Sequence, residues 1–311
     1  MSVARRSSPV WHPFTQHALR NVLPTVAHAE GAYLTTADGR RLFDGVSSWW
    51  VITHGHCHPR IVAAIREQAE RLDQVIFAEF THEAAEEVAS RLLKLVPPGP
   101  DYVFFSDSGS TSVEVALKMA LGYWRHVGES RDRIAVMESS YHGDTAGTMS
   151  VGARGLFTDP YEPLLFSVDV IPFPTPGHEA LTFDALQKFC RARTIAAFLV
   201  EPLVLGAGGM RMYSPRVLAE LHRICAANNV LFIADEVMTG WGRTGTFSAC
   251  DQAGISPDIA CYSKGLTGGA LPLAVTLCRH EIFEAHYSTD RRRTFFHSSS
   301  FTANPIRIVQ L

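Results

Sequence analysis

The chain has 311 residues, a length that suits one large domain with a smaller one attached. Hydrophobic residues make up 46% and charged residues 19%, as in globular proteins, and a net charge of −3 gives no reason to expect nucleic acid or an anionic membrane as a partner. The 6 cysteines are scattered without a C-x-x-C pair, which argues against a zinc framework and against a disulfide scaffold.

The N-terminal part of the chain differs from the rest. Residues 1–10 lack the apolar core of a secretory signal, and no apolar run in the sequence is long enough to span a membrane, so we expect a soluble cytoplasmic protein. An Asp38-Gly39 turn and a β-like run at Arg41–Phe43 follow. We assign residues 1–57 to the N-terminal segment of a smaller domain.

From residue 58 onward, segments typical of strands alternate with segments typical of helices. The strand-like runs are short and apolar almost throughout, as in strands that are buried on both faces. This alternation predicts an α/β fold with a mostly parallel, mixed sheet, and residues 58–311 form the large domain. The expected strands are Tyr102–Phe105, Ile134–Glu138, Ile195–Val200, Val230–Ala234, Asp258–Tyr262 and Leu273–Cys278.

Helix starts are visible between these strands. Thr111, followed by Glu114, is typical of a capping box, and Ser214 followed by Pro215 indicates a second helix start. The stretch Phe166–Thr182 is rich in proline, and we expect it to be a surface connection.

Two of the expected strands end next to residues that can carry chemistry. Asp235 follows the buried run VLFIA, and Lys264 follows DIACYS among small residues and glycines. Ligands of open α/β sheets bind at the carboxyl ends of strands, where a carboxylate could pair with a protonated nitrogen and a desolvated lysine becomes an amine nucleophile. Each feature alone is also typical of ordinary structure, namely a strand-end aspartate that caps a turn and a solvated loop lysine.

The loop SDSGSTS, residues 106–112, lies between an expected strand and the start of a helix. Unpaired N–H groups and the helix dipole favour an anion there, Gly109 lets the backbone approach closely, and Ser110 and Thr111 can add hydroxyl donors. Tyr141, beside a glycine turn after another strand, could stack on a flat ring. An ordinary N-cap cluster and a buried core aromatic remain alternatives for these two features.

Other conspicuous residues are given no role at this stage. The histidines between His54 and His58 lack the helical spacing usual for metal ligands, so we expect no metal site. The glycines of Gly206–Gly209 do not have dinucleotide-binding spacing, and Arg291–Arg293 is interpreted as a solvated patch.

Together, the anion cradle, the aromatic, the carboxylate and the amine complement the groups of pyridoxal 5'-phosphate (PLP). The runs LFIADEVMTGWGRTGTF and SPDIACYSKGLTGG resemble the class III (ornithine/ω-amino) aminotransferases of PLP fold type I. Further support comes from WHPFT at Trp11, DGVSSWW at Asp44, YHGDT at Tyr141 and GAGGMRMY at Gly206, and the resemblance extends to Pro305.

The resemblance implies a role for each candidate residue. Lys264 resembles the catalytic lysine that holds PLP as a Schiff base, and Asp235 resembles the partner of the pyridine nitrogen. Gly109 and Ser110 resemble the phosphate-binding pair. Tyr141 resembles the aromatic residue that packs on the cofactor and borders the substrate.

The resemblance also implies a homodimer with a shared active site. Ser299 and Ser300 lie where the family has a phosphate-binding loop donated by the neighbouring subunit, usually Pro-Thr. Trp49 resembles a tryptophan that contacts substrate. Ser298 stands in place of a glycine whose backbone touches substrate, and Phe14 in place of a frequent tyrosine, so two substrate contacts depart from the family pattern.

Within the class, the chain looks most like the branch that acts in biotin synthesis. This implies S-adenosylmethionine as amino donor and 8-amino-7-oxononanoate as acceptor; an ω-amine or lysine as donor is the alternative. After Asn304-Pro305 the family continues into a C-terminal small domain, which carries an arginine that grips the substrate carboxylate. Here the chain ends with IRIVQL, so we expect that domain to be missing, and a chain without activity is a third interpretation.

Overall fold

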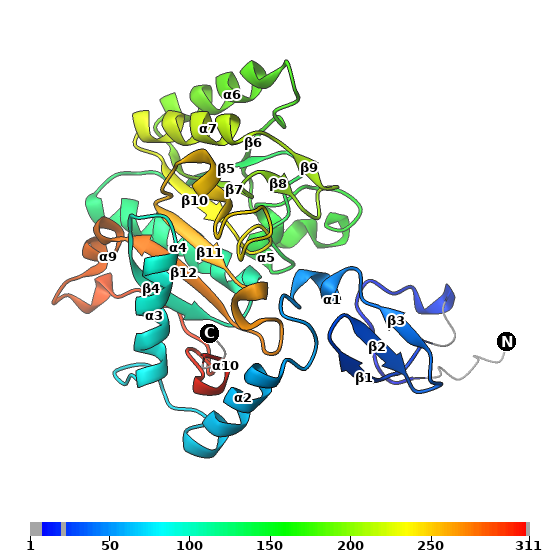
Figure 1. The fold of residues 1–311 in the computed structure, drawn as a ribbon. Coiled ribbons are helices and arrows are strands. Elements are labelled where there is room, and N and C mark those ends of the chain that lie inside the picture. Colours follow the sequence, from blue (N-terminus) through cyan, green and yellow to red (C-terminus); the bar gives the residue numbers. More distant parts are fainter. Residues whose placement is uncertain (1–7, 20–22, 309–311) are drawn as a thin grey trace.

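The computed structural model describes residues 8–19 and 23–308 and is built around one large sheet (Figure 1). Strand β12 runs antiparallel to both of its neighbours, and the other pairs are parallel, so the sheet is mixed and mostly parallel as predicted. In sheet order the strands are β4 (Pro100–Ser106), β12 (Ala274–Arg279), β11 (Ile259–Tyr262), β10 (Leu231–Asp235), β7 (Ile195–Val200), β5 (Arg133–Met137) and β6 (Asp169–Ile171).

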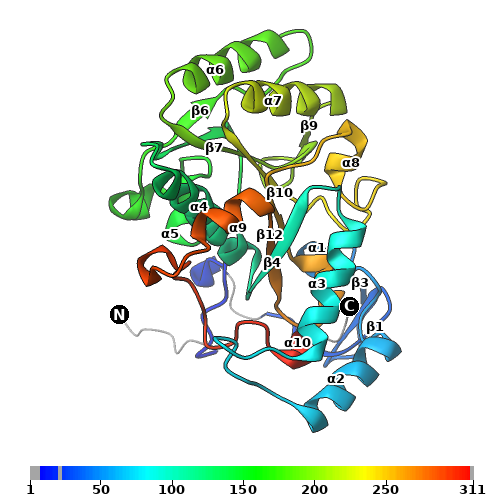
Figure 2. The ribbon, with the colours of Figure 1, turned by 90° about the vertical axis from the view of Figure 1, so that its left-hand side faces the viewer.

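Helices cover both faces of this sheet (Figures 1 and 2). One face packs on α4 and α9 through residues such as Leu199 and Ile233, and the other packs on α6 and α7 through Phe198 and Phe232. Helix α3 covers β4, β11 and β12. Since both faces are covered, every residue of β7, β10 and β11 is buried, which explains their apolar runs. The helices are α3 (Glu83–Leu95), α4 (Gly109–Val127), α6 (Glu179–Arg191), α7 (Pro215–Ala227) and α9 (His280–His286).

A separate three-stranded antiparallel sheet lies to one side of the large sheet (Figure 1). It is followed by α1 (Ser47–Trp50), whose four residues all have a positive φ, between 47° and 66°. This sheet falls inside the predicted smaller domain, whose boundary at residue 57 stays a prediction. The strands are β1 (Val26–Glu30), β2 (Tyr33–Thr36) and β3 (Arg41–Phe43), and α2 (Pro59–Arg71) leads from this region to α3.

Short elements complete the structure. They are β8 (Val204–Leu205), β9 (Arg211–Met212), α5 (Ala146–Ser150), α8 (Ala249–Ala253), α10 (Pro305–Ile308), and the 3-10 turns η1 (His17–Leu19), η2 (Asp159–Leu164), η3 (Lys264–Thr267) and η4 (Arg291–Arg293). In the part of the chain that is described, no helix has both the length and the apolar character needed to cross a membrane.

The six expected strands are confirmed, with ends shifted by no more than two residues, but one helix start is wrong. Ser108, not Thr111, caps α4: its Oγ accepts the Thr111 N–H at 3.2 Å, and the Thr111 hydroxyl accepts the Ser108 N–H at 2.9 Å. The threonine thus fills the place that glutamate usually takes in a capping box. The start at Ser214 is confirmed, since its side chain accepts the N–H of Val217.

The expectation that Phe166–Thr182 is only a connection is also wrong. Asp169–Ile171 forms the edge strand β6, and α6 begins at Glu179. The strand has three residues, pairs only with β5, and leaves half of the Val170 surface exposed. Such a short edge strand lacks the long apolar run by which the central strands were predicted.

Candidate active site

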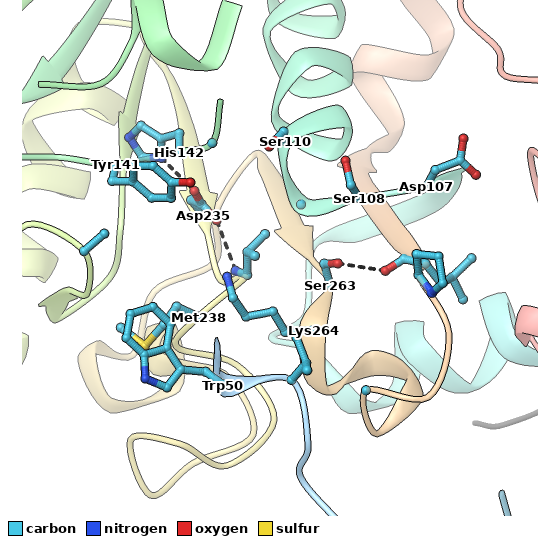
Figure 3. A pocket seen from close by; sticks show the side chains of 18 of the residues that line it. Trp50, Asp107, Ser108, Ser110, Tyr141, His142, Asp235, Met238, Ser263 and Lys264 are labelled. Atoms are coloured by element: carbon cyan, nitrogen blue, oxygen red, sulfur yellow. Dashed lines mark hydrogen bonds and ion pairs between the residues drawn. The ribbon is translucent and has the colours of Figure 1, made fainter. Parts of the chain in front are cut away.

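A cavity of about 440 Å³ opens where β4, β7, β10 and β11 end (Figure 3). This is the edge of the sheet at which parallel α/β folds bind ligands. The candidate residues that line the cavity are Gly109, Ser110, Tyr141, Asp235 and Lys264. The fold therefore brings together residues that are more than 150 positions apart in the sequence.

Asp235 is the last residue of β10, and its carboxylate is almost fully buried, at 5% exposure. Its Oδ2 lies 2.6 Å from His142 Nδ1, and its Oδ1 accepts the N–H of Val237 at 3.1 Å. These two contacts fix the plane of the carboxylate. A buried, fixed carboxylate is suited to hold a protonated ring nitrogen, because the charge pair is shielded from water.

His142 lines the cavity and contacts Asp235, but no role was predicted for it from the sequence. Its side chain is fully buried, and its Nε2 has no hydrogen-bond partner among the described residues. The available signal was its position directly after Tyr141 in the run YHGDT, but nothing local indicates that it meets a residue 93 positions away.

Lys264 begins η3, two residues after the end of β11. Its side chain extends into the cavity toward Asp235, and its Nζ lies 5.9 Å from the centroid of the Trp50 ring (Figure 3). Burial lowers the pKa of Lys264, against the attraction of the Asp235 and Glu201 carboxylates. A lysine with a lowered pKa supplies an unprotonated amine more readily, as a nucleophile or a base requires.

The N-terminus of α4 forms one end of the cavity. The capping contacts of Ser108 and Thr111 occupy those two side chains, while the first-turn N–H groups of Gly109 and Ser110 have no partner within the helix. A Cβ at Gly109 would lie 2.6 Å from Val237 Cγ1, so only glycine leaves the backbone this close to the strand end. The result is an anion cradle with a helix dipole behind it.

Tyr141 also lines the cavity, and Glu201 holds its backbone. The Tyr141 hydroxyl donates to Asp144 at 3.1 Å, and its N–H donates to Glu201 Oε1 at 3.0 Å. The other Glu201 oxygen accepts the N–H of Gly206 at 2.9 Å. Burial raises the pKa of Tyr141 well above its usual value, so its phenol stays protonated, and burial raises the pKa of Glu201 to about 7. No role was predicted for Glu201 from the sequence.

The remaining candidates lie away from this cavity. Trp49 is 59% exposed and makes an edge contact with Phe14 at 5.7 Å between ring centroids, whereas its neighbour Trp50 lines the cavity. The serines of the expected partner loop, Ser298, Ser299 and Ser300, are exposed on the surface. Their roles toward substrate and toward a neighbouring subunit stay predictions.

The cavity fits PLP in the chemistry of its donors. An amine, a fixed carboxylate, an aromatic residue and an anion cradle all face one space, and they complement an aldehyde, a ring nitrogen, a flat ring and a phosphate. Glycine at position 109 lets the start of α4 pack directly against Val237 beside the end of β10, since a side chain there would collide with Val237.

Comparison with known proteins agrees with this description. The family model described as Aminotransferase class-III matches residues 14–310. The adenosylmethionine-8-amino-7-oxononanoate aminotransferase of Synechococcus elongatus is 50% identical over 305 residues, which are 96% of this chain and 72% of that one. The enzyme of the same name from Geobacter sulfurreducens is 40% identical, over 96% of this chain and 69% of its own.

Two solved structures show the same fold. The adenosylmethionine-8-amino-7-oxononanoate aminotransferase of Methanocaldococcus jannaschii superposes with a TM-score of 0.93 at 31% identity, over 97% of this chain and 70% of its own. An amine transaminase from an uncultivated Pseudomonas species, solved in its PLP-bound form, gives a TM-score of 0.90 at 31% identity, over 97% of this chain and 72% of its own. The chain therefore belongs to the class III aminotransferases, PLP-dependent enzymes of fold type I.

Proposed function

We propose that this chain transfers an amino group from S-adenosylmethionine to 8-amino-7-oxononanoate, which forms 7,8-diaminononanoate in biotin biosynthesis. The observation that carries the chemistry is the convergence of a desolvated lysine, a fixed carboxylate and an anion cradle on one cavity. The choice of substrates is supported by relatives that are 36–50% identical over at least 96% of this chain and carry the name of that enzyme.

Each residue of the cavity has a definite task in this proposal. Bound PLP supplies a ring that accepts negative charge from the substrate carbon. Lys264 holds the cofactor at rest and, once freed, moves the proton of the donor's α-carbon as general base and then general acid. Asp235 keeps the ring nitrogen protonated, Gly109 and Ser110 hold the phosphate, and the Tyr141 ring packs on the cofactor.

Aromatic side chains would contact the substrates. Trp50 lies in the cavity close to the Lys264 amine and offers an apolar and cation–π surface, which suits an alkyl chain or a sulfonium. Trp49, one residue earlier, was expected from the sequence to contact substrate. Because Trp49 does not line this cavity, it would contact only a part of the substrate that extends out of the cavity. Substitution of each tryptophan separates the two assignments.

We also propose a cytoplasmic homodimer in which Ser299 and Ser300 reach the phosphate of the neighbouring subunit. Their exposure is compatible with that role, and large aromatic side chains are exposed elsewhere, with Trp11 at 88%, Phe14 at 67% and Phe157 at 74%. Exposed apolar patches are typical of association surfaces. All six cysteines are unpaired, as in proteins of reducing compartments.

A second candidate is a class III aminotransferase that uses an ω-amine or lysine as donor. It is favoured by the similarity to solved amine and ω-transaminases, which are 30–31% identical with TM-scores of 0.90 and 0.91. Turnover measured with S-adenosylmethionine, lysine and an aliphatic amine, each with 8-amino-7-oxononanoate as acceptor, discriminates the two. Faster transfer from lysine than from S-adenosylmethionine would contradict the first proposal.

The cofactor site itself is tested on the purified 311-residue chain. With added PLP we expect visible absorbance that borohydride bleaches, and mass spectrometry should find the reduced adduct on Lys264. Lys264→Ala should bind PLP without the adduct and should not turn over. Gel filtration of the same sample measures the oligomeric state, and a folded, PLP-binding chain without turnover would support the interpretation as an inactive chain.

A further inference from the structure

Asp107 is an unexpected neighbour for a phosphate. It lies directly before Ser108, the N-cap of α4, and it lines the cavity together with Gly109 and Ser110. A carboxylate beside a bound phosphate repels it, and this repulsion grows where the site is shielded from water. The cradle therefore needs something that removes the effect of this charge.

Arg307 meets Asp107 from the far end of the chain. Its Nη1 lies 2.6 Å from Asp107 Oδ1, across 200 positions of sequence, and the side chains are only 19% and 29% exposed. A charge pair that is partly shielded interacts more strongly than one at the open surface. The guanidinium also lies 5.3 Å from the centroid of the Phe301 ring, which limits the directions it can take.

The segment that carries Arg307 is fixed from two sides. The Arg307 N–H donates to Asn304 Oδ1 at 3.2 Å, and Asn304 Nδ2 donates to the carbonyl of Asp73 and to Gln74 Oε1, both at 2.8 Å. His82 Nε2 lies 2.7 Å from the carbonyl oxygen of Ala303. Arg307 is thus held in place by the α2–α3 connection.

We propose that Arg307 is a positioning residue for the cofactor site: it neutralises Asp107 and so allows the N-terminus of α4 to bind the phosphate of PLP. The proposal rests on the cofactor site proposed above. Arg307 does not contact the cofactor in this proposal. It contacts only the Asp107 carboxylate, which would otherwise repel the phosphate. Removal of the arginine should therefore weaken binding of the phosphate and leave binding of the rest of the cofactor unchanged.

The test compares PLP with pyridoxal, which has the same aldehyde and ring but no phosphate. Dissociation constants are measured by absorbance titration of the apo chain at pH 8, where the phosphate is doubly charged. The variants are Arg307→Gln, Arg307→Lys, Asp107→Asn and the double variant of Arg307→Gln with Asp107→Asn. Arg223→Gln is the control, because Arg223 forms a similar 2.6 Å pair with Glu220 on the surface of α7.

We expect Arg307→Gln to weaken PLP binding by about 3- to 30-fold, the range that corresponds to a partly shielded charge interaction, with pyridoxal binding unchanged. Arg307→Lys should recover most of the loss, and the double variant should bind PLP nearly as the wild type does. Asp107→Asn alone should bind PLP at least as tightly as the wild type. The control should change neither constant.

Two results would overturn the proposal. Equal weakening of PLP and pyridoxal by Arg307→Gln would mean that the arginine only supports the fold, and unchanged PLP binding would mean that Asp107 does not oppose the phosphate. A wild-type chain that binds no PLP would overturn the cofactor site itself, and this outcome is separate because it appears before any variant is made.

Discussion

Replacement of His142 with phenylalanine tests how the cavity fixes the Asp235 carboxylate. His142 Nδ1 lies 2.6 Å from Asp235 Oδ2, and the histidine side chain is fully buried. Phenylalanine is of similar size but has no donor, so Oδ2 loses its partner while Oδ1 keeps the N–H of Val237. A hydrogen bond to a charged group contributes about 1.5–3 kcal/mol, so we expect amino transfer to slow by about 10- to 150-fold.

Stability should change far less than this rate. The same substitution removes Nε2, a buried nitrogen without a hydrogen-bond partner among the described residues, whose desolvation costs about 1–3 kcal/mol. Stopped-flow absorbance measures single-turnover amino transfer, and urea unfolding measures stability. His222→Phe is the control, because His222 contacts Phe232 and the carbonyl of Ser256 and does not line the cavity. A His142→Phe enzyme slowed no more than this control would refute the positioning role.

Three further predictions follow from the cavity lining. The pKa of Glu201 is raised from 4.5 to about 7, so between these pH values the native state binds more protons than the unfolded chain. The free energy of unfolding therefore falls as the pH rises through this range. Urea unfolding at pH 5 and pH 8 measures this fall, and Glu201→Gln should reduce it by up to about 3 kcal/mol. Gly109→Ala should weaken PLP binding by about ten-fold or more in an absorbance titration, because its Cβ would lie 2.6 Å from Val237 Cγ1; unchanged affinity would contradict the cradle. Trp50→Ala should raise the KM of the amino donor by about ten-fold, and a larger effect from Trp49→Ala would favour the assignment made from the sequence.

The sequence was sufficient to predict the strands that carry the site. Because β10 and β11 are buried on both faces, their apolar runs stand out, and the polar residues Asp235 and Lys264 that follow them are conspicuous. Parallel strands bring their carboxyl ends to one edge, so residues after different strands were expected to meet. The structure places both of these residues, together with Gly109, at one cavity.

The partners of these residues could not be predicted in the same way. His142 and Asp235 are 93 positions apart, and Arg307 and Asp107 are 200 apart, so each contact depends on the packing of whole elements rather than on a local pattern. Which of the neighbours Trp49 and Trp50 faces the cavity could not be predicted from the sequence either. The left-handed backbone of Ser47–Trp50 directs Trp50 to the cavity, and no periodicity in the sequence reports that conformation.

Two residues that line the cavity, Trp50 and Lys264, have a strained backbone with positive φ. Trp50, with φ of 65°, ends the left-handed turn α1, and Lys264 has φ of 49°; such conformations cost about 1–2 kcal/mol per residue. The turn persists because Asp44 accepts from the N–H and the hydroxyl of Ser48 at 3.1 and 2.7 Å, and because Arg243 Nη2 donates to the carbonyl of Trp50 at 2.9 Å. The fully buried strands β7, β10 and β11 supply stability that offsets these local costs. The side chains of Trp50 and Lys264 are therefore directed before any ligand arrives, and a site that is ordered in advance loses less entropy on binding.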